Sequence, residues 1–142
     1  MTGLLRISEA ASLGLHTASF LARKGAEVAT THEIAERLKV SEAHLSKVLQ
    51  RLAKAGIVES SRGPKGGFTL ARPADKMTLL DVYEAIEGKF KPAGCLFGRY
   101  VCGGKCILGD MVATVNTLVR EQLTGTKVSE AGLILDARSG NA

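Results

Sequence analysis

All three cysteines of the chain lie within one short, glycine-rich segment. Cys95, Cys102 and Cys106 are separated by six and three residues, and residues 94–109 also contain five glycines. Three thiols on such a segment can converge on one metal site, and glycines let backbone N–H groups approach a thiolate or bridging sulfur and stabilise its negative charge. The odd number of cysteines argues against a structural disulfide framework and favours metal or redox chemistry.

Several chemical roles fit these thiols. Iron–sulfur ligation suits three cysteines beside glycines best. A zinc site and a reversible disulfide switch are alternatives, and so are buried cysteines that act as small apolar side chains. A redox enzyme fits less well, because an activated cysteine would stand at a helix start or in a Cys-x-x-Cys pair, and the sequence shows neither. We therefore expect a protein that is not an enzyme.

A second set of candidate functional side chains lies on the outer face of a predicted helix, residues 41–55. Its apolar residues face the core and recur at i, i+3, i+4 and i+7: Leu45, Val48, Leu49 and Leu52. A helix in the DNA major groove reads bases mainly with its N-terminal half, whereas later Lys and Arg side chains contact phosphates. The expected base readers are Ser41, Glu42, His44 and Ser46, and the expected backbone contacts are Lys47, Gln50, Arg51 and Lys54. A merely solvated charged face is the alternative.

The excess positive charge lies in the first half of the chain. Residues 1–76 contain twelve Lys and Arg against seven Asp and Glu, residues 77–142 contain seven of each, and the formal net charge is +5. Such asymmetry is typical of a surface that binds phosphate, although a solvated basic face explains many similar patterns.

Local signals place the 41–55 helix in a helix-turn-helix unit. We predict a first, mostly buried helix over residues 4–24, which Gly25 ends. Thr30 and Glu33 form the pattern of a capping box and predict a short second helix. About three residues separate it from Ser41, a favourable N-cap, and so tight a connection is typical of helix-turn-helix units. The 41–55 helix would be the recognition helix.

A basic hairpin follows the recognition helix. Residues 57–61 and 68–71 are predicted strands, and the glycines and proline between them predict a turn. In a winged helix this hairpin, the wing, lies at the adjacent groove. Its expected DNA contacts are Arg62, Gly63, Lys65 and Gly66. A winged helix that has lost DNA binding and serves only protein interaction is the alternative.

The second half of the chain supplies the elements around the cysteines. Thr78 and Asp81 predict a capped helix that runs to Glu87 and ends at Gly88. After the cysteine segment, an apolar stripe predicts a helix over residues 107–123, and a stripe so apolar needs a partner. Residues 125–142 mix Gly, Ser and charge around one apolar patch, so we assign them no element and expect a partly disordered tail.

Size and composition fit one globular domain. The 142 residues are 45% hydrophobic and 23% charged, which suffices for a core without disulfides. No apolar run approaches the roughly 18 residues of a membrane span, and the N-terminal stretch contains Glu9 and His16 rather than a clean secretion signal. We therefore expect a cytoplasmic protein with no membrane partner.

The sequence resembles the winged-helix transcription regulators of the IscR and NsrR type, the Rrf family of iron–sulfur or redox sensors. The resemblance covers residues 4–123 and rests on residues 33–35, on residues 41–58 and above all on the wing string, residues 62–68. It implies a mainly α fold with a small β-hairpin: a winged helix-turn-helix domain (1–76), then a cysteine-loop sensor with a long dimerisation helix (77–124), then the tail (125–142). It also implies a homodimer that binds double-stranded DNA at a two-fold related operator, usually as a repressor.

The resemblance further implies that an iron–sulfur cluster on the three cysteines controls operator affinity, with a 2Fe–2S type favoured over 4Fe–4S. A fourth ligand is needed, and the position that holds a histidine in some members is Gly109 here. Other members use a carboxylate or histidine from the first helix of the partner subunit, and by that alignment Ser12 holds the carboxylate position. His16, one turn later, becomes the first candidate, and Glu9 and Asp110 are weaker ones.

Overall fold

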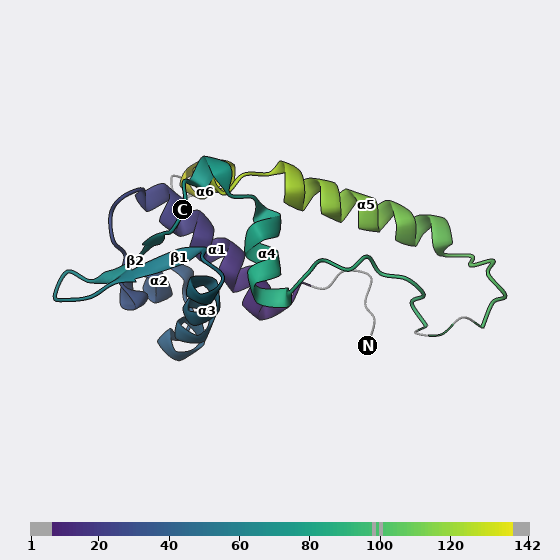
Figure 1. Cartoon of the computed structure of the whole chain (residues 1–142), viewed down its shortest axis with the longest axis horizontal. Helices are drawn as coiled ribbons and strands as arrows, with labels where there is room; N and C mark the ends of the chain where they lie inside the picture. The colour runs from purple at the N-terminus through teal and green to yellow at the C-terminus, as the bar shows by residue number, and fades with distance from the viewer. Residues whose placement is uncertain (1–6, 98, 100, 138–142) are drawn as a thin grey trace.

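The computed structural model describes residues 7–97, 99 and 101–137, and its fold is mainly helical (Figure 1). The expected mainly α fold with one β-hairpin is confirmed. Strands β1 and β2 pair antiparallel, from Val58 opposite Leu70 to Ser61 opposite Gly67. The elements in chain order are α1 (Glu9–Lys24), α2 (Thr31–Leu38), α3 (Glu42–Lys54), β1 (Val58–Ser61), β2 (Gly67–Leu70), a 3-10 turn η1 (Ala74–Lys76), α4 (Leu79–Glu87), α5 (Gly109–Gly125) and α6 (Val128–Ala137).

Side-chain caps set the starts of helices α1 to α4. Ser8 accepts a hydrogen bond from the Ala11 N–H at 3.0 Å, so α1 starts at Glu9. The predicted start at residue 4 is therefore wrong for residues 7 and 8, and residues 4–6 lie outside the described residues. Thr78 and Asp81 form the expected reciprocal capping box at α4.

Helices α1 and α2 are joined by a charged contact as well as by the core. The Thr30 hydroxyl accepts from the Glu33 N–H at 3.1 Å, as predicted. The Glu33 carboxylate instead accepts from Lys24 Nζ at 2.7 Å, and Glu27 lies 3.4 Å from the same Nζ. The hydrogen bond to Glu33 raises the pKa of Lys24 above its ordinary value. Burial opposes this rise with a smaller effect, and Glu27 adds a still smaller rise.

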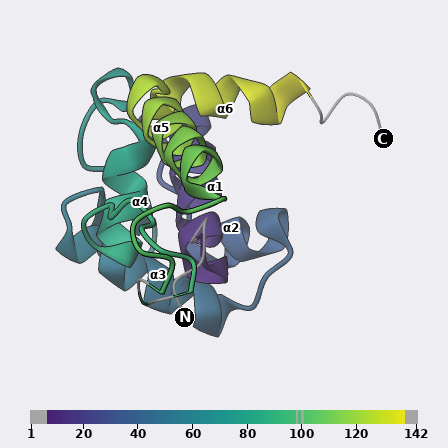
Figure 2. The same ribbon diagram turned by 90° about the vertical axis from the view of Figure 1, so that its right-hand side faces the viewer.

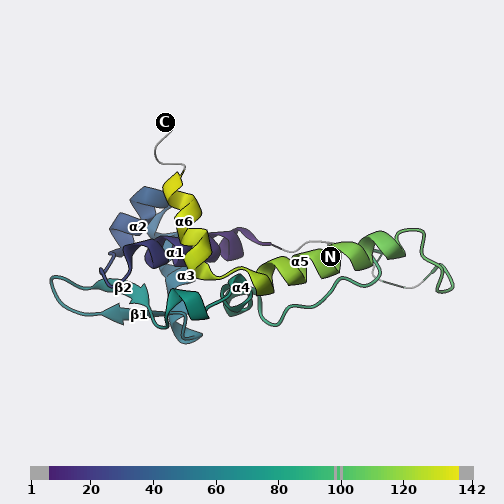
Figure 3. The ribbon, with the colours of Figure 1, turned by 90° about the horizontal axis from the view of Figure 1, so that it is seen from above.

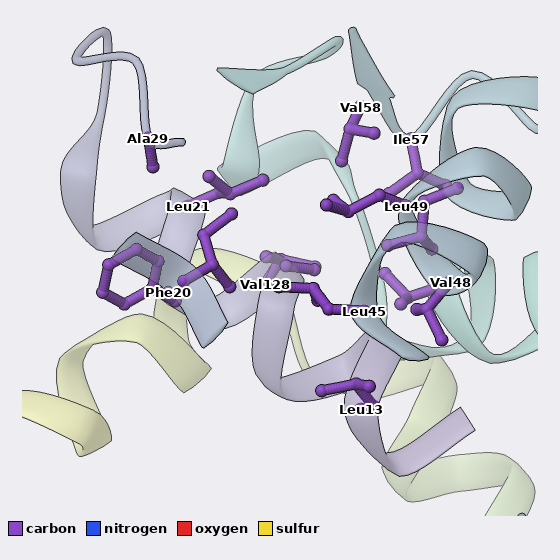
Figure 4. Packing of buried hydrophobic residues seen from close by; sticks show 14 of the residues in the cluster. Leu13, Phe20, Leu21, Ala29, Leu45, Val48, Leu49, Ile57, Val58 and Val128 are labelled. Carbon is purple, nitrogen blue, oxygen red and sulfur yellow. The ribbon is translucent and has the colours of Figure 1, made fainter. Parts of the chain in front are cut away.

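The core joins the first three helices to the wing (Figure 4). Leu21 of α1, Ile34 of α2, and Leu45 and Leu49 of α3 are fully buried in one cluster with Val58 of β1. Each such side chain contributes roughly 1.5–3 kcal/mol of hydrophobic stabilisation, so this cluster fixes the angle of α3 relative to α1.

The wing is tied back to the linker between α1 and α2. Ala29 and Phe68 exchange two backbone hydrogen bonds, of 3.0 and 2.8 Å. Gly67 lies so close to this linker that a Cβ on it would come within 2.5 Å of the Ala29 carbonyl oxygen. Glycine at this position therefore permits the close approach that fixes the wing.

Helix α5 extends away from the rest of the molecule (Figures 1 and 3). Its C-terminal part packs on α4, where Leu123 and Tyr83 are buried together. Farther toward its N-terminus Met111 and Leu118 are 46% and 55% exposed. It begins at Gly109 and ends at Gly125, two residues later at each end than predicted. The described part of the chain contains no helix that could cross a membrane.

The chain then returns to α1 through a helix that the sequence pattern did not predict. Residues 128–137 form α6, so the expected partly disordered tail is wrong for these residues, and residues 138–142 lie outside the described part. The Val128 N–H donates to the Met77 carbonyl at 2.8 Å, and the Val128 side chain is fully buried. A Cβ on Gly132 would lie 3.2 Å from the Ser19 carbonyl oxygen, so α6 packs closely on α1.

Candidate DNA-binding surface and cysteine pocket

The outer face of α3 carries the side chains that the sequence predicted for DNA contact. Most of the predicted set is exposed: Ser41, Glu42, Lys47, Gln50, Arg51 and Lys54. His44 and Ser46 are half-buried. Together with Ala10 and Val48, five of these residues line one open pocket of about 530 Å³: His44, Lys47, Gln50, Arg51 and Lys54. The face therefore gathers cationic and hydrogen-bonding groups in one concave surface.

Two predicted base readers also hold the helix-turn-helix together. Ser41 is the N-cap of α3, and its hydroxyl accepts from the His44 N–H at 3.2 Å. The Glu42 carboxylate lies 3.0 Å from Nδ1 of His32 on α2, and Nε2 of the same histidine lies 3.5 Å from Glu36. Sequence reasoning missed His32, because this pairing joins side chains ten residues apart across the turn.

The wing presents its cationic side chains at the tip. Arg62, Gly63 and Lys65 are exposed, and Gly66 is half-buried. The Gly66 N–H donates to the Gly63 carbonyl at 2.9 Å and closes the turn. A Cβ on Gly66 would overlap the Ser61 carbonyl oxygen, so the turn needs glycine there.

The three cysteines line one pocket at the far end of α5. The pocket has a volume of about 270 Å³, and the residues around it are Ala93, Gly94, Cys95, Cys102, Cys106, Gly109, Val112, Ala113 and Asn116. Cys95 is half-buried, whereas Cys102 and Cys106 are exposed, and all three are free thiols. In Figure 2, which looks nearly along α5, the cysteine segment passes beneath the near end of this helix. The three thiols therefore line one cavity, whereas their predicted convergence on one metal site stays a prediction.

The side chains that one chain contributes to this pocket do not form a metal centre in the described part of the structure. No three Cys, His, Asp or Glu side chains of the described residues lie close enough together to hold a metal ion. The Cys95 thiol donates instead to the Arg99 carbonyl oxygen at 3.2 Å. Thiols thus surround the cavity but are not drawn to a common point.

The three candidates for a fourth ligand do not line this pocket. His16 and Glu9 line a separate cavity of about 220 Å³ on α1 together with Leu38 and Val40. His16 is exposed, and its Nδ1 lies 2.7 Å from the Ser12 carbonyl oxygen. Asp110 is exposed in the first turn of α5. The two cavities share no lining residue, so the structure does not place His16 with the thiols of its own chain.

Comparison with known proteins gives consistent matches over most of the chain. The model of the family Rrf2, described as iron-dependent transcriptional regulators, matches residues 7–131. YwgB of Bacillus subtilis (strain 168), named as a candidate HTH-type transcriptional regulator, is 34% identical over 114 residues, which span 75% of this chain and 73% of that protein.

Solved structures extend the similarity to the whole arrangement of helices. CymR, described as the global cysteine regulator of B. subtilis, aligns with a TM-score of 0.78 at 27% identity and covers 92% of this chain and 98% of its own. IscR of T. potens aligns with a TM-score of 0.70 at 26% identity and covers 97% and 92%. These matches include the winged helix and α5 alike.

Proposed function

Because the chain belongs to the Rrf2 family of transcriptional regulators, we propose that it is a homodimeric repressor whose operator affinity depends on an iron–sulfur cluster at the cysteine pocket. The family membership makes the chain a DNA-binding transcription regulator with a winged helix-turn-helix, as the sequence resemblance predicted. The dimer, the repressor role and the cluster are the proposed parts. The observation that carries the cluster is the single cavity lined by all three thiols.

In the proposed DNA complex, residues 1–76 supply every contact. Helix α3 lies in the major groove with Ser41, Glu42, His44 and Ser46 toward the bases. Lys47, Gln50, Arg51 and Lys54 face the phosphates, since they follow along the same exposed side of the helix. The wing supplies Arg62 and Lys65 at the adjacent groove, where the Gly63–Gly66 turn brings the backbone close to DNA.

The proposed dimer forms along α5, within residues 77–124. Met111 and Leu118 are large apolar side chains that stand about half exposed on a helix that projects from the body of the molecule. Ile107, just before α5, is 99% exposed. An exposed apolar stripe of this kind is stabilised when a second copy covers it, and a two-fold dimer would match a two-fold related operator.

The side chains around the pocket fit an iron–sulfur group. Thiolates are the ligands that such clusters prefer, and two of the four α5 residues that line the cavity, Gly109 and Ala113, are small. When bound, the group would bring a redox-active and oxygen-sensitive centre to Cys95, Cys102 and Cys106. We favour the 2Fe–2S type over 4Fe–4S on the resemblance to IscR-type regulators alone, since both types ordinarily take four protein ligands.

The fourth ligand in this proposal is His16 of the partner subunit. Its Nδ1 is held 2.7 Å from the Ser12 carbonyl, which leaves Nε2 directed away from the backbone and available to bind metal. His16 is exposed on α1 and is separate from the thiols of its own chain. Glu9 shares its cavity and could serve instead, and Asp110 is the local oxygen alternative.

A ligand from α1 would couple the sensor to DNA recognition. Helix α1 packs on α3, and Leu13 of α1 is buried in the same core cluster as Leu45 and Leu49 of α3. A cross-link between the cysteine pocket of one subunit and α1 of the other would therefore set the angle between the two α3 helices. These helices must lie about 34 Å apart to enter successive major grooves, so oxidation, nitrosylation or loss of the cluster would change operator affinity.

A thiol–disulfide switch is the second candidate function. Cys102 and Cys106 are both exposed and line the same cavity, and the similar protein CymR is described as a cysteine regulator. In this alternative, hydrogen peroxide would take two electrons and the two thiol protons from a pair of cysteines, which forms one disulfide and two water molecules with no metal involved. A zinc ion on the same thiols is a further version of the site.

Anaerobic purification of the full chain tests these alternatives. The cluster proposal predicts a coloured protein that contains iron and acid-labile sulfide in equal amounts and loses the visible absorption when Cys102 is changed to Ser. A colourless, zinc-loaded protein would favour the zinc site. A colourless, metal-free protein that gains one intramolecular disulfide with peroxide would favour the thiol switch.

A further inference from the structure

The side-chain amide of Asn116 makes two hydrogen bonds to a single residue of the cysteine segment. Its Oδ1 accepts from the Ala93 N–H at 2.9 Å, and its Nδ2 donates to the Ala93 carbonyl oxygen at 2.7 Å. Both bonds are partly buried. A primary amide matches a backbone N–H and C=O pair in one orientation only, so the donor and acceptor assignments are mutually consistent.

This amide stands on the side of α5 that faces the thiols. Gly109, Val112, Ala113 and Asn116 follow the i, i+3, i+4, i+7 pattern of one helix face, and all four line the cysteine pocket. Ala93, which Asn116 holds, lies two residues before Cys95. The amide therefore connects the helix that carries the pocket to the residue next to its first thiol.

A second contact fixes the segment where it leaves α4. Glu84 accepts from the Phe90 N–H at 2.7 Å, and the Phe90 ring lies 6.0 Å from the Tyr83 ring and 5.2 Å from the guanidinium carbon of Arg120. Among the described residues, the Cys95 thiol donates only to the Arg99 carbonyl, which belongs to the same segment. Contacts up to Phe90 thus cannot by themselves place Cys95 against α5.

We propose that Asn116 is the positioning residue of the cysteine segment, which holds Cys95 at the pocket that Cys102 and Cys106 share. Asn116 acts through the backbone of Ala93 and touches no thiol in this role. The importance of this placement for sensing rests on the proposed function, but the placement itself requires no metal. The positioning role of Asn116 and the proposed cluster-dependent function can therefore be disproved separately.

Site-resolved alkylation of the reduced, metal-free full chain tests the proposal. Wild-type and variant chains are treated with iodoacetamide, and the rate at each cysteine is read by mass spectrometry of peptides. Asn116→Leu keeps a similar shape but removes both hydrogen bonds. It should speed alkylation of the half-buried Cys95 several-fold, up to about the thirtyfold that two neutral hydrogen bonds can contribute, and leave Cys102 and Cys106 unchanged.

Two further variants separate positioning from general stability. Asn116→Asp keeps an acceptor for the Ala93 N–H but loses the donor, so its Cys95 rate should lie between those of wild type and Asn116→Leu. Thr117→Ala changes the exposed neighbour on α5 and should leave all three rates unchanged. If Asn116→Leu lowers the melting temperature of the whole chain, the Cys95 alkylation rate of Asn116→Asp relative to wild type is the test of the positioning role.

The outcomes are distinct. Acceleration confined to Cys95, with partial rescue by Asp, supports the positioning role even if the protein never binds a cluster. Equal rates at Cys95 in wild type, Asn116→Leu and Asn116→Asp, or equal acceleration of all three cysteines in Asn116→Asp, would overturn it. In cluster-loaded protein, the same variants should lose visible absorption to a chelator faster than Thr117→Ala does.

Discussion

Replacement of Lys47 by Ala isolates one phosphate contact of the recognition helix. Lys47 is exposed on α3 and lines the concave surface with Arg51 and Lys54. It has no ion-pair or hydrogen-bond partner among the described residues, so its removal leaves the internal contacts of the fold intact. The variant should therefore lose DNA affinity at nearly unchanged melting temperature.

The size of the loss follows from counterion release. A dimer presents Lys47 twice, and each phosphate contact contributes about 0.9 to the slope of log K against log salt, so the slope should become shallower by about 1.8. At about 0.1 M salt this effect alone weakens binding about 60-fold, which corresponds to about 2.5 kcal/mol. The loss should be similar for operator and random DNA, because phosphates carry no sequence information.

Fluorescence anisotropy with operator DNA, repeated across salt concentrations, measures both quantities. Lys89→Ala is the matched control, since it removes the same charge from an exposed residue just after α4. A salt slope that Lys47→Ala leaves unchanged, or a Lys89→Ala variant that loses as much affinity, would refute the assignment of α3 as the helix that contacts DNA.

Three further outcomes are expected. Gly67→Ala should weaken DNA binding and leave the dimer intact in sedimentation. The added Cβ would come within 2.5 Å of the Ala29 carbonyl oxygen and displace the wing. Undiminished DNA affinity would contradict the role of the wing. Leu118→Glu should convert the dimer to a monomer in analytical ultracentrifugation, since Leu118 is 55% exposed on the proposed interface of α5, and a persistent dimer would place the interface elsewhere. Lys24→Met should lower the free energy of unfolding by the same amount at pH 7 and pH 9. This loss should shrink only above the ordinary lysine pKa of 10.5, because the raised pKa of Lys24 keeps its stabilising charge up to that pH. A loss that already shrinks between pH 7 and pH 9 in chemical denaturation would contradict this prediction.

The helix-turn-helix could be predicted because its signals are local. Ser41 accepts from the His44 N–H and Thr30 from the Glu33 N–H, each within three residues, so their spacing alone indicates where α2 and α3 begin. The predicted start of α1 is too early because apolar residues also precede Ser8 and extend the helical pattern. The Ser8 hydroxyl, which accepts from the Ala11 N–H, caps the helix and marks its true start.

Helix α6 could not be predicted because tertiary packing stabilises it. Gly132 interrupts its sequence with a poor helix former, yet a side chain there would meet the backbone of α1 at Ser19. The Val128 N–H donates to the carbonyl oxygen of Met77, which lies 51 residues earlier, and the Val128 side chain is buried. A local sequence pattern cannot predict a contact over that separation.

At the cysteine site, spacing and glycines predicted that the thiols lie near one another but not what supports them. The three thiols lie within twelve consecutive residues, 95–106, so their proximity follows from chain length. The bonds from Asn116 to Ala93 join residues 23 apart, and an asparagine inside an apolar stripe gives no sign of its partner.

The most direct test of the central claim compares one dimer in two states on one operator. Operator DNA selected from a random pool is titrated anaerobically with cluster-loaded protein and with the same preparation after chelation, and dimer content is verified in both. If the cluster sets the angle between the α3 helices, the two affinities should differ by at least about tenfold, since a rotation that breaks one phosphate contact per subunit would weaken binding by about 60-fold at about 0.1 M salt. Identical affinities for the loaded and cluster-free dimers would contradict the proposed switch.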